Sequence, residues 1–297
     1  MNTPGTSRAM LSPRGRRQVG YVLVLAAVVG AALGVETIVL HLTTDPLVDI
    51  RRYWEAGARL NAGLPLYGLT SPDTTATYLY PPLLAILFRP LALLPFEAAA
   101  AAWEAVVVLS LLATLRRIGL GRPLLLALGM LALPIGWSLA IGQVEVVLTL
   151  LLAIGAPWAV ALAGHVKLLP WLVAVFWLGR RDLRSLAWLA AWTAGLGVLQ
   201  LVLAPDATLD FLRLSWLKAT LDVNNASLWV IHPAAWVAGA LVALIVALRL
   251  APTRWGWAAA IVFTVAANPR LLVYQLTALL AALAGPARGR EGAGDAP

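Results

Sequence analysis

Long, uninterrupted apolar runs constrain the fold of this chain more than any other feature of its sequence. A membrane-spanning helix needs about 20 apolar residues, and runs of this kind recur along the 297-residue chain. Charged residues make up only 12% of the chain, whereas soluble domains contain about a quarter. The runs are continuous and rich in Leu, Ala and Val, unlike the short alternating segments of a transmembrane β-barrel. We therefore predict an all-α, polytopic helical membrane protein.

The apolar runs predict where the chain crosses the membrane. The expected spans lie at about 19–41, 96–115, 123–141, 144–160, 184–204, 233–250, 255–268 and 270–285. The stretch 161–179 is expected to hold two short helices. A signal peptide is the alternative interpretation of the first run, because basic residues precede it. That run continues to Leu42, which is too long for a typical signal core, so an uncleaved span is favoured.

The distribution of Lys and Arg predicts the orientation of the chain. With a cytoplasmic N-terminus, fourteen Arg residues lie inside, near 8–17, 116–122, 180–184, 249–254 and 288–290. Seven basic residues then lie outside: Arg51, Arg52, Arg59, Arg89, Arg213, Lys218 and Arg270. Cytoplasmic loops carry the excess of basic residues. We therefore expect a multi-pass protein of the plasma (cell inner) membrane with both termini in the cytoplasm.

One membrane domain is predicted over residues 1–297, with two sizeable loops on the outer face at 42–95 and 205–232. This topology requires that YLYPPLLAILFRPLALLP (78–95) does not cross, and the stretch is indeed short and interrupted by Arg89. Both loops mix apolar and charged residues at near-helical spacing, as do helices that lie in the headgroup region. Residues 1–18 are predicted to be a cytoplasmic tail and 286–297 a disordered one. Because the inside loops are short, we expect any chemistry on the outer face.

The first outer loop contains acidic residues just after a span, in TTDPLVDIRRYWEAGARLNAGLPLY (43–67). Its helical part is amphipathic, with Ile50, Tyr53, Trp54, Gly57 and Leu60 on one face. Asp49 lies at the start of this helix, where an Asp commonly caps the backbone N–H groups. A carboxylate at a membrane boundary can also deprotonate a hydroxyl group held beside it. Both roles remain open for Asp49, because a carboxylate has several acceptor sites.

Other polar residues stand within or beside the apolar runs, where unpaired burial is expensive. Glu145 and Lys167 are each as compatible with a structural ion pair as with a functional site. Asn225 and Ser227, in the outer-loop stretch NNAS, can bind a sugar or cap the helix that begins near Trp229. The small residues of GAALG (30–34) fit close helix packing.

Several classes of function are excluded by what the sequence lacks. The net charge of +8 is spread over short clusters between apolar runs, which does not indicate nucleic-acid binding. Cys is absent, and the three His residues are far apart in sequence, so neither a metal site nor another cofactor is expected. No phosphate-cradling Gly loop and no DxD motif for a nucleotide sugar is present. An outer-face sugar transferase would accordingly use a lipid-linked donor.

Five stretches, taken in order, resemble glycosyltransferase family 87 over about residues 20–285. They are VDIRRYWEAGARLNAGLPLY, YLYPPLLAILFRPLALLP followed by Trp103, IGQVEVVLTLLL, GHVKLLP with a following RR, and NNASL. The family comprises polyprenol-phosphate-mannose-dependent mannosyltransferases of the type C membrane fold. The resemblance implies a type C glycosyltransferase-like bundle with interfacial helices in its outer loops.

The resemblance also implies an inverting transfer of a hexose, mannose as in the family, from a polyprenyl phosphate to a glycolipid or other membrane-associated acceptor. Asp49 matches the position of the general base, with Asp45 as the second choice. The phosphate of the donor would be bound by Lys167, Arg270 or Arg89. The sugar and acceptor sites would be lined by Gln143, Glu145, Asn225, Ser227 and Tyr80.

The chain departs from the family pattern in two places. The stretch NPRLLVYQ (268–275) carries Tyr274 and Gln275 where the family usually has a His. The stretch from Gly155 to Trp177 is shorter than two full helices. A lipid or solute transporter, and a catalytically inactive family member that binds lipid-linked sugar, are the alternatives. Against a transporter, the polar residues gather at the outer ends of the spans and are not distributed through them.

Overall fold

Helices form almost all of the described chain. The computed structural model describes residues 12–67, 78–213 and 225–286. The elements are α1 (Pro13–Thr44), α2 (Val48–Asn61), α3 (Pro82–Phe88), η2 (Leu91–Leu93), α4 (Phe96–Ile118), α5 (Arg122–Met130), α6 (Ala132–Ile141), α7 (Glu145–Ile154), α8 (Pro157–Val166), η3 (Leu169–Ala174), α9 (Val175–Gly179), α10 (Leu183–Leu203), α11 (Pro205–Arg213), η5 (Leu228–Val230), α12 (Pro233–Leu250), α13 (Gly256–Ala266) and η6 (Val273–Leu283), the η elements being 3₁₀ helices.

Four helices among the described residues are long and apolar enough to cross a membrane. They are Arg17–Thr44 of α1, then α4, α10 and α12, and they match four of the predicted spans. The helices α5 and α6 occupy the span predicted at 123–141 but meet at an angle of 64°. The prediction of an all-α, multi-pass membrane protein is confirmed.

The other predicted spans differ from the structure in continuity, in length or in helix type. The stretch 144–160 is divided between α7 and α8. The stretch 255–268 contains α13, which has 11 residues; at 1.5 Å per residue such a helix is about 16 Å long, roughly half of the hydrocarbon core. The stretch 270–285 forms the 3₁₀ helix η6. Hydropathy identified these segments as apolar, but it did not identify the break within 144–160 or the short length of the helix in 255–268.

The break between α7 and α8 has a local cause. Gly155 ends α7 in the left-handed conformation, with φ of 65°, which costs glycine little because it lacks a Cβ. Pro157 then opens α8 at its first turn, where a missing N–H is tolerated. The predicted pair of short helices in 161–179 agrees with the end of α8 followed by η3 and α9.

The long first helix packs against the bent pair through small residues. Gly30 lies against the backbone of Gly129 and Met130, and Gly34 lies against Ala132. A Cβ built on Gly34 would lie 2.6 Å from the carbonyl carbon of Ala132. Small residues allow such close approach of helix backbones in a membrane, and the predicted packing role of GAALG is confirmed.

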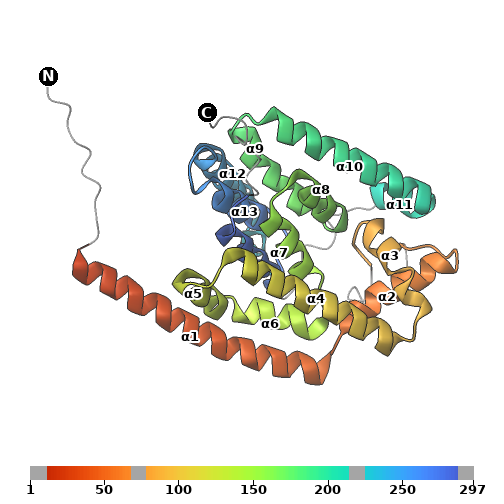
Figure 1. Cartoon of the computed structure of the whole chain (residues 1–297), viewed down its shortest axis with the longest axis horizontal. Helices are drawn as coiled ribbons and strands as arrows, with labels where there is room; N and C mark the ends of the chain where they lie inside the picture. Colours follow the sequence, from red (N-terminus) through yellow and green to blue (C-terminus); the bar gives the residue numbers. More distant parts are fainter. Residues whose placement is uncertain (1–11, 68–77, 214–224, 287–297) are drawn as a thin grey trace, which may run out of the picture.

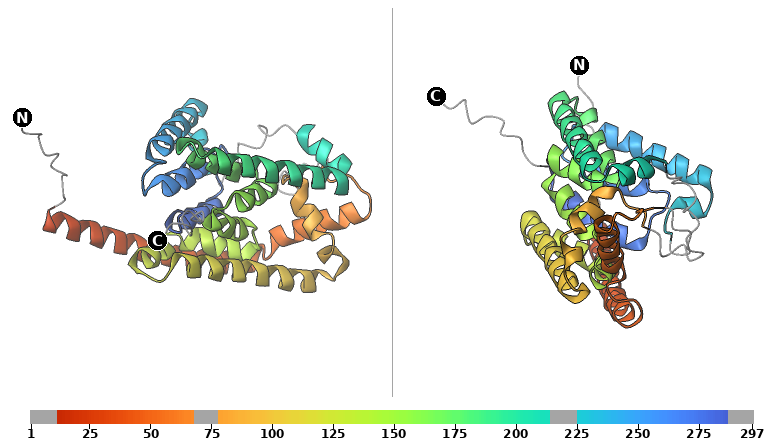
Figure 2. Two further views of the ribbon diagram at one scale, coloured as in Figure 1. Left: turned by 45° about the horizontal axis from the view of Figure 1, so that its top comes forward. Right: turned by 90° about the vertical axis from the view of Figure 1, so that its right-hand side faces the viewer.

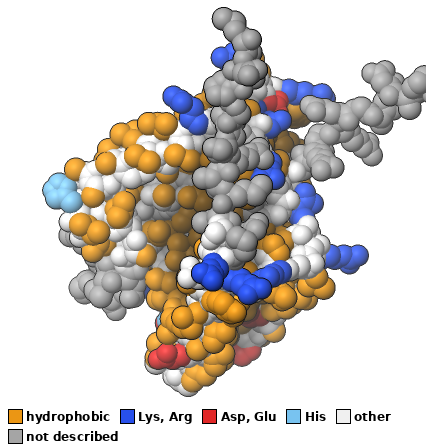
Figure 3. All heavy atoms as spheres, turned by 90° about the vertical axis from the view of Figure 1, so that its left-hand side faces the viewer, with side chains coloured by type: hydrophobic (Ala, Val, Ile, Leu, Met, Phe, Trp, Pro, Cys, Tyr) orange, Lys and Arg blue, Asp and Glu red, His pale blue; other side chains and the backbone are white. Residues whose placement is uncertain are grey.

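The helices of the predicted outer loops gather at one end of the molecule. Figure 1 shows α1, α4 and α10 running along its length, with α2, α3 and α11 together at the end opposite the start of α1; the two views of Figure 2 agree. Figure 3 faces the end from which α1 begins, where Lys and Arg side chains lie between apolar ones and acidic side chains are few. The short α3 and η2 account for 78–95, in keeping with the prediction that this stretch does not cross.

The amphipathic helix predicted in the first outer loop is α2, and its apolar face is buried. Ile50 and Tyr53 are fully enclosed, and Ala56 and Gly57 lie on the same face. Gly57 allows α2 to approach the backbone at Phe88. Because this face is covered by α3 and α4, α2 is held firmly enough to orient the polar side chains at its start.

Some predictions fall outside the described residues. They concern residues 1–11, Lys218, Asn224 and the tail after 286. Within the described chain, α1 begins at Pro13, so residues 13–18 of the predicted cytoplasmic tail are helical.

Replacing Gly34 with Leu tests the packing of α1. The added side chain would meet Ala132 of α6, and overpacking of this kind typically lowers the free energy of unfolding by about 1–3 kcal/mol. Thermal unfolding of the detergent-solubilised protein measures the change. Gly195→Leu is the matched control, because no atom lies within 4 Å of a Cβ at Gly195; equal stability of both variants would contradict the packing role.

Candidate active site

Asp49 points into the protein from the first turn of α2. Leu47, in the left-handed conformation with φ of 58°, precedes the helix, and α2 begins at Val48 without a side-chain cap. Asp49 is therefore a helix residue and not its N-cap, and the predicted capping role is wrong. Its carboxylate is 5% exposed, so its oxygens need partners supplied by other parts of the fold.

Those partners come from Gln143 and Arg52. The Gln143 Nε2 donates to Asp49 Oδ2 at 2.5 Å, and Arg52 Nη1 lies 3.2 Å from Oδ1. The Tyr53 hydroxyl donates to Gln143 Oε1 at 2.6 Å, which directs the amide nitrogen toward Asp49. Tyr80 adds a hydroxyl contact of 3.2 Å to the same oxygen. Asp49 is thus held by a hydrogen-bond network that joins α2 to the turn after α6.

The turn that presents Gln143 depends on Gly142. This residue ends α6 with φ of 69°, in the left-handed region, and a Cβ there would lie 2.1 Å from the Ile50 side chain. Its carbonyl accepts a hydrogen bond of 2.8 Å from Trp103 Nε1. Gln143 itself is fully buried. The sequence IGQ therefore brings α2 and the amide of Gln143 together in a way that another residue at position 142 would prevent.

A second charged pair stands beside this network. Lys167 Nζ lies 2.6 Å from Glu145 Oε2, and the two side chains are only 17% and 7% exposed. The ammonium lies over the Tyr80 and Tyr274 rings, 5.6 Å and 5.0 Å from their centroids, within the range of cation–π attraction. Lys167 is also close enough to Asp49 to interact with it electrostatically.

Burial raises the pKa of Asp49 above its ordinary value of 3.8. Removing a carboxylate from water disfavours its charged form. The Arg52 guanidinium and the Lys167 ammonium act in the opposite direction, and the nearby Asp45 adds to the increase. A carboxylate with a raised pKa accepts a proton more readily than an ordinary aspartate, which suits a general base.

The structure brings together six of the residues predicted from the sequence. Asp49, Gln143, Tyr80, Glu145 and Lys167 form the hydrogen-bonded and ionic cluster just described. Arg270 lies beside it, because it acts electrostatically on Tyr274, whose ring contacts Lys167. Asp45 is adjacent but is occupied differently: it bonds His41 Nδ1 at 2.7 Å, and its side chain is 42% exposed.

Arg89, a candidate phosphate ligand, lies elsewhere. Its Nε donates to Asn61 Oδ1 at 2.9 Å, and Asn61 is the last residue of α2. The twelve residues from Asp49 to Asn61 place these positions about 18 Å apart along the helix. The structure does not bring Arg89 to the Asp49 cluster.

Asn225 and Ser227 have structural partners. The Asn225 side chain donates to the Pro269 carbonyl and accepts from the backbone N–H of Ser227 and Leu271. The Ser227 hydroxyl accepts from the N–H of Trp229 at 3.1 Å, as an N-cap does. These contacts tie the NNAS stretch to the chain around Arg270, and they agree with the capping alternative for Ser227.

Sequence reasoning missed three partners in the cluster. Arg52 lies three residues after Asp49, and Tyr53 lies four residues after it. These are the spacings of neighbouring side chains on a helix. That signal was available, although it identified Tyr53 only as an apolar contact. Tyr274 was noted for replacing a His, but its ring contact with Lys167 depends on folding.

The positive charges near Asp49 in the described ranges come from the Arg52 and Lys167 side chains. Within those ranges, no group of three or more His, Cys, Asp or Glu residues could hold a metal ion. The charges at the site are those of Arg and Lys, which can stabilise an anion directly. The arrangement thus defines a helical membrane protein in which a buried carboxylate faces cations suited to a phosphate group.

Comparison with known proteins gives the family. The model of glycosyltransferase family 87 matches residues 78–286. The polyprenol-phosphate-mannose-dependent alpha-(1-2)-phosphatidylinositol pentamannoside mannosyltransferase of Mycobacterium tuberculosis (strain CDC 1551 / Oshkosh) is 30% identical over 238 residues, 71% of this chain and 54% of the relative. The chain belongs to glycosyltransferase family 87.

A protein with the same printed name from Mycolicibacterium smegmatis (strain ATCC 700084 / mc(2)155) is 33% identical over 170 residues, 50% of this chain and 41% of the relative. The chain therefore spans about half the length of the curated relatives it matches. No solved structure matches the chain. The family predicted from the five ordered stretches is confirmed.

Replacing Lys167 with Met tests whether the pair with Glu145 is a buried salt bridge. Removing one partner leaves a buried charge uncompensated, which typically lowers the free energy of unfolding by about 3–5 kcal/mol. The double variant Lys167→Met with Glu145→Gln removes both charges and should recover most of this loss. Unfolding in detergent measures the unchanged protein, the two single variants Lys167→Met and Glu145→Gln, and the double variant; additive losses of the two single variants would contradict a coupled pair.

Proposed function

We propose that this protein is a membrane mannosyltransferase that transfers a hexose from a polyprenyl-phosphate donor to a lipid-linked acceptor, with Asp49 as general base. One observation carries the proposal. The buried Asp49 carboxylate is fixed by Gln143 and Arg52 and lies within electrostatic range of Lys167. A base and a cation close to each other are what sugar transfer from a phosphate requires.

The proposed step is a single displacement. Asp49 takes the proton from a hydroxyl of the acceptor, and the oxygen attacks the anomeric carbon of the sugar. The new glycosidic bond forms as the bond between the anomeric carbon and the phosphate oxygen breaks. The polyprenyl phosphate leaves with one more negative charge than it carried in the donor. Attack opposite the leaving group inverts the anomeric configuration.

Lys167 is the proposed ligand of the leaving phosphate, with Arg270 beside it. The extra negative charge develops on that phosphate, where a preorganised cation contributes most. Glu145 holds Lys167 in place through the 2.6 Å contact. The rings of Tyr80 and Tyr274 flank the ammonium and can contact the sugar. Tyr274 therefore stands where the family usually has a His, next to the proposed phosphate.

Three residues are assigned roles other than the sugar and acceptor binding first expected of them. Gln143 is proposed as a positioning residue for Asp49, because its amide nitrogen donates to the carboxylate and its oxygen is occupied by Tyr53. Asn225 and Ser227 are proposed to shape the loop beside Arg270, through the backbone contacts described above. Neither assignment requires a cofactor.

The choice of substrates follows the relatives. Their printed names specify a polyprenol-phosphate-mannose donor and a phosphatidylinositol pentamannoside acceptor. We propose mannose for the donor sugar and a glycolipid for the acceptor of this chain. The gathering of α2, α3 and α11 at the end opposite the start of α1 (Figure 1) supports an outer-face site with cytoplasmic termini in the plasma membrane.

Asp49→Asn should lower transfer from polyprenyl-phosphate mannose by at least about 10²-fold, because the base can no longer accept a proton. Radiolabelled transfer by the purified protein in liposomes measures this rate. Asn can still accept the Gln143 hydrogen bond, so folding should be preserved. Asp45→Asn is the matched control and should remain active; full activity of Asp49→Asn would exclude the proposed base.

The dependence of the transfer rate on pH should also reflect the raised pKa of Asp49. A base works only when deprotonated, so transfer should fall as the pH drops through this pKa, at a higher pH than for an ordinary aspartate. Arg52→Gln removes a charge that lowers the pKa, so the acidic limb should move to still higher pH. Rate profiles against pH for both proteins test this, and a shift to lower pH would contradict it.

A further inference from the structure

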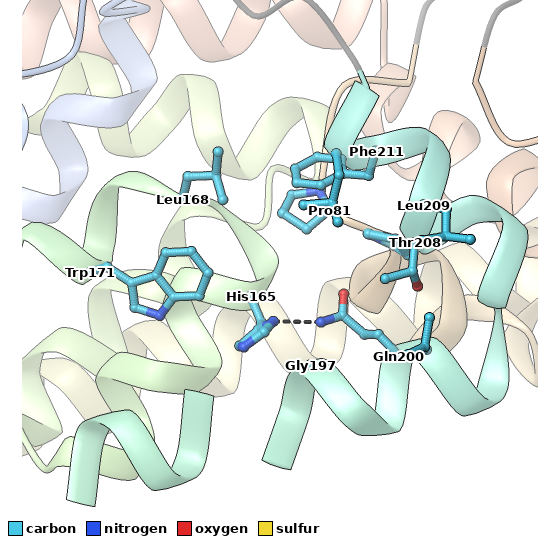
Figure 4. Close-up of a pocket in the computed structure, with 12 residues that line it drawn as sticks. Pro81, His165, Leu168, Trp171, Gly197, Gln200, Thr208, Leu209 and Phe211 are labelled. Carbon is cyan, nitrogen blue, oxygen red and sulfur yellow. Dashed lines mark hydrogen bonds between the residues drawn. The ribbon is translucent and has the colours of Figure 1, made fainter. Parts of the chain in front are cut away.

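A cavity of about 360 Å³ lies next to the Asp49 cluster but is not part of it. Its walls come from α3, α8, η3, α10 and α11, and they include Pro81, His165, Leu168, Trp171, Gln200 and Phe211. Figure 4 shows these side chains surrounding the space, with Leu168 and Trp171 on one side and Pro81 and Phe211 on the other. Its volume is in the range of ligand pockets.

Most of the polar groups in the cavity wall already have hydrogen-bond partners within the protein. The Gln200 Nε2 bonds His165 Nδ1, drawn as a dashed line in Figure 4, and Gln200 Oε1 accepts from the Leu83 N–H. His165 Nε2 bonds the Thr193 carbonyl, and the Thr208 hydroxyl donates to the Ala204 carbonyl. The indole nitrogen of Trp171 has no hydrogen-bond partner among the described residues, but it is buried against Gly164 and not accessible from the cavity. The wall therefore suits an occupant made of hydrocarbon.

The cavity opens onto the apolar surface. Leu201, Leu209 and Leu212 line it and are also exposed. These residues belong to α10, a candidate span, and to the adjoining α11. A hydrocarbon chain longer than the cavity could therefore continue past them into lipid.

The cavity adjoins the proposed phosphate site at two points. Leu168 and Pro81 line the cavity, and each directly follows a residue of the polar cluster, Lys167 and Tyr80. Consecutive Cα atoms are 3.8 Å apart. An apolar cavity that meets a cation in this way fits an amphiphile with an anionic head and a hydrocarbon tail.

We propose that this cavity binds the first isoprene units of the polyprenyl-phosphate donor. The choice of donor rests on the proposed function, in which Lys167 binds the phosphate. The polyprenyl chain is bonded to that phosphate, so its first units must lie close to Lys167, whose neighbour in the chain, Leu168, lines the cavity. The chains of a glycolipid acceptor are separated from its reacting hydroxyl by the whole head group.

Gly197 offers a way to fill the cavity without disturbing the fold. It lines the space from α10, and a Cβ there would meet only the His165 Cε1, at 3.8 Å. Gly197→Leu therefore places a side chain in the cavity. Gly195→Leu on the same helix is the matched control, because nothing lies within 4 Å of its Cβ and Gly195 is not among the cavity residues.

The first experiment measures binding and needs no catalysis. A short-chain polyprenyl monophosphate with a photoreactive group on its chain, and no sugar, is crosslinked to the purified full-length protein. Labelling should map to peptides that contain Pro81 and Pro82 or residues 157–213, and it should fall about tenfold in Gly197→Leu, since the filled cavity excludes apolar groups. Gly195→Leu and Asp49→Asn should label like the unchanged protein. Equal labelling of Gly197→Leu, or labels that map elsewhere, would overturn the proposal.

The second experiment separates donor from acceptor. In the transfer assay, Gly197→Leu should raise the KM for the donor about tenfold and leave the KM for the acceptor unchanged. An increase confined to the acceptor KM would assign the cavity to the acceptor and refute the proposal. If Gly197→Leu does not fold, Leu201→Trp at the mouth of the cavity replaces it. Loss of labelling in Gly197→Leu together with full activity of Asp49→Asn would refute the base and retain the cavity.

Discussion

The hydrogen bond from Gln143 to Asp49 is the interaction around which the candidate site is organised. A buried carboxylate needs donors, because loss of water without replacement is expensive. Asp49 lies on α2, and its donor lies on the turn between α6 and α7. That turn exists because Gly142 adopts a left-handed conformation and leaves room for Ile50. The position of α2 and the orientation of its carboxylate therefore depend on each other.

The second constraint is the burial of opposite charges. Lys167 and Glu145 would each be unfavourable alone at this depth, and their direct contact makes both tolerable. The pair also leaves the ammonium pointed at the rings of Tyr80 and Tyr274. Tyr80 also contacts Gln143, the donor to Asp49. The Lys167–Glu145 pair and the Asp49 carboxylate therefore belong to one network. A substitution in the Asp49–Gln143 pair should therefore alter the interactions of the Lys167–Glu145 pair, and the reverse.

Much of this could be predicted from the sequence, and the limits have physical reasons. Apolar run length identified α1, α4, α10 and α12, since burial in lipid depends on local hydropathy. The buried face of α2 followed from its periodicity. The N-cap interpretation of Asp49 was wrong because the deciding partner, Gln143, is 94 residues away. The pairing of Glu145 with Lys167 crosses 22 residues, so each residue alone fitted a structural and a functional role equally.

The breaks between helices explain why hydropathy alone does not reveal the arrangement of the candidate active site. Gly142, Gly155 and the end of α8 before Lys167 interrupt apolar stretches that would otherwise cross as straight spans. Irregular backbone at membrane depth is tolerated only where it is enclosed by protein or lines a cavity. Here two of the breaks supply Gln143 and Lys167, the amide and the cation of the cluster. The irregular backbone at these two breaks thus supplies polar groups of the cluster. Beyond them, at Pro81 and Leu168, the chain passes directly into an apolar wall, so single peptide bonds separate residues of the polar cluster from residues of the apolar cavity wall.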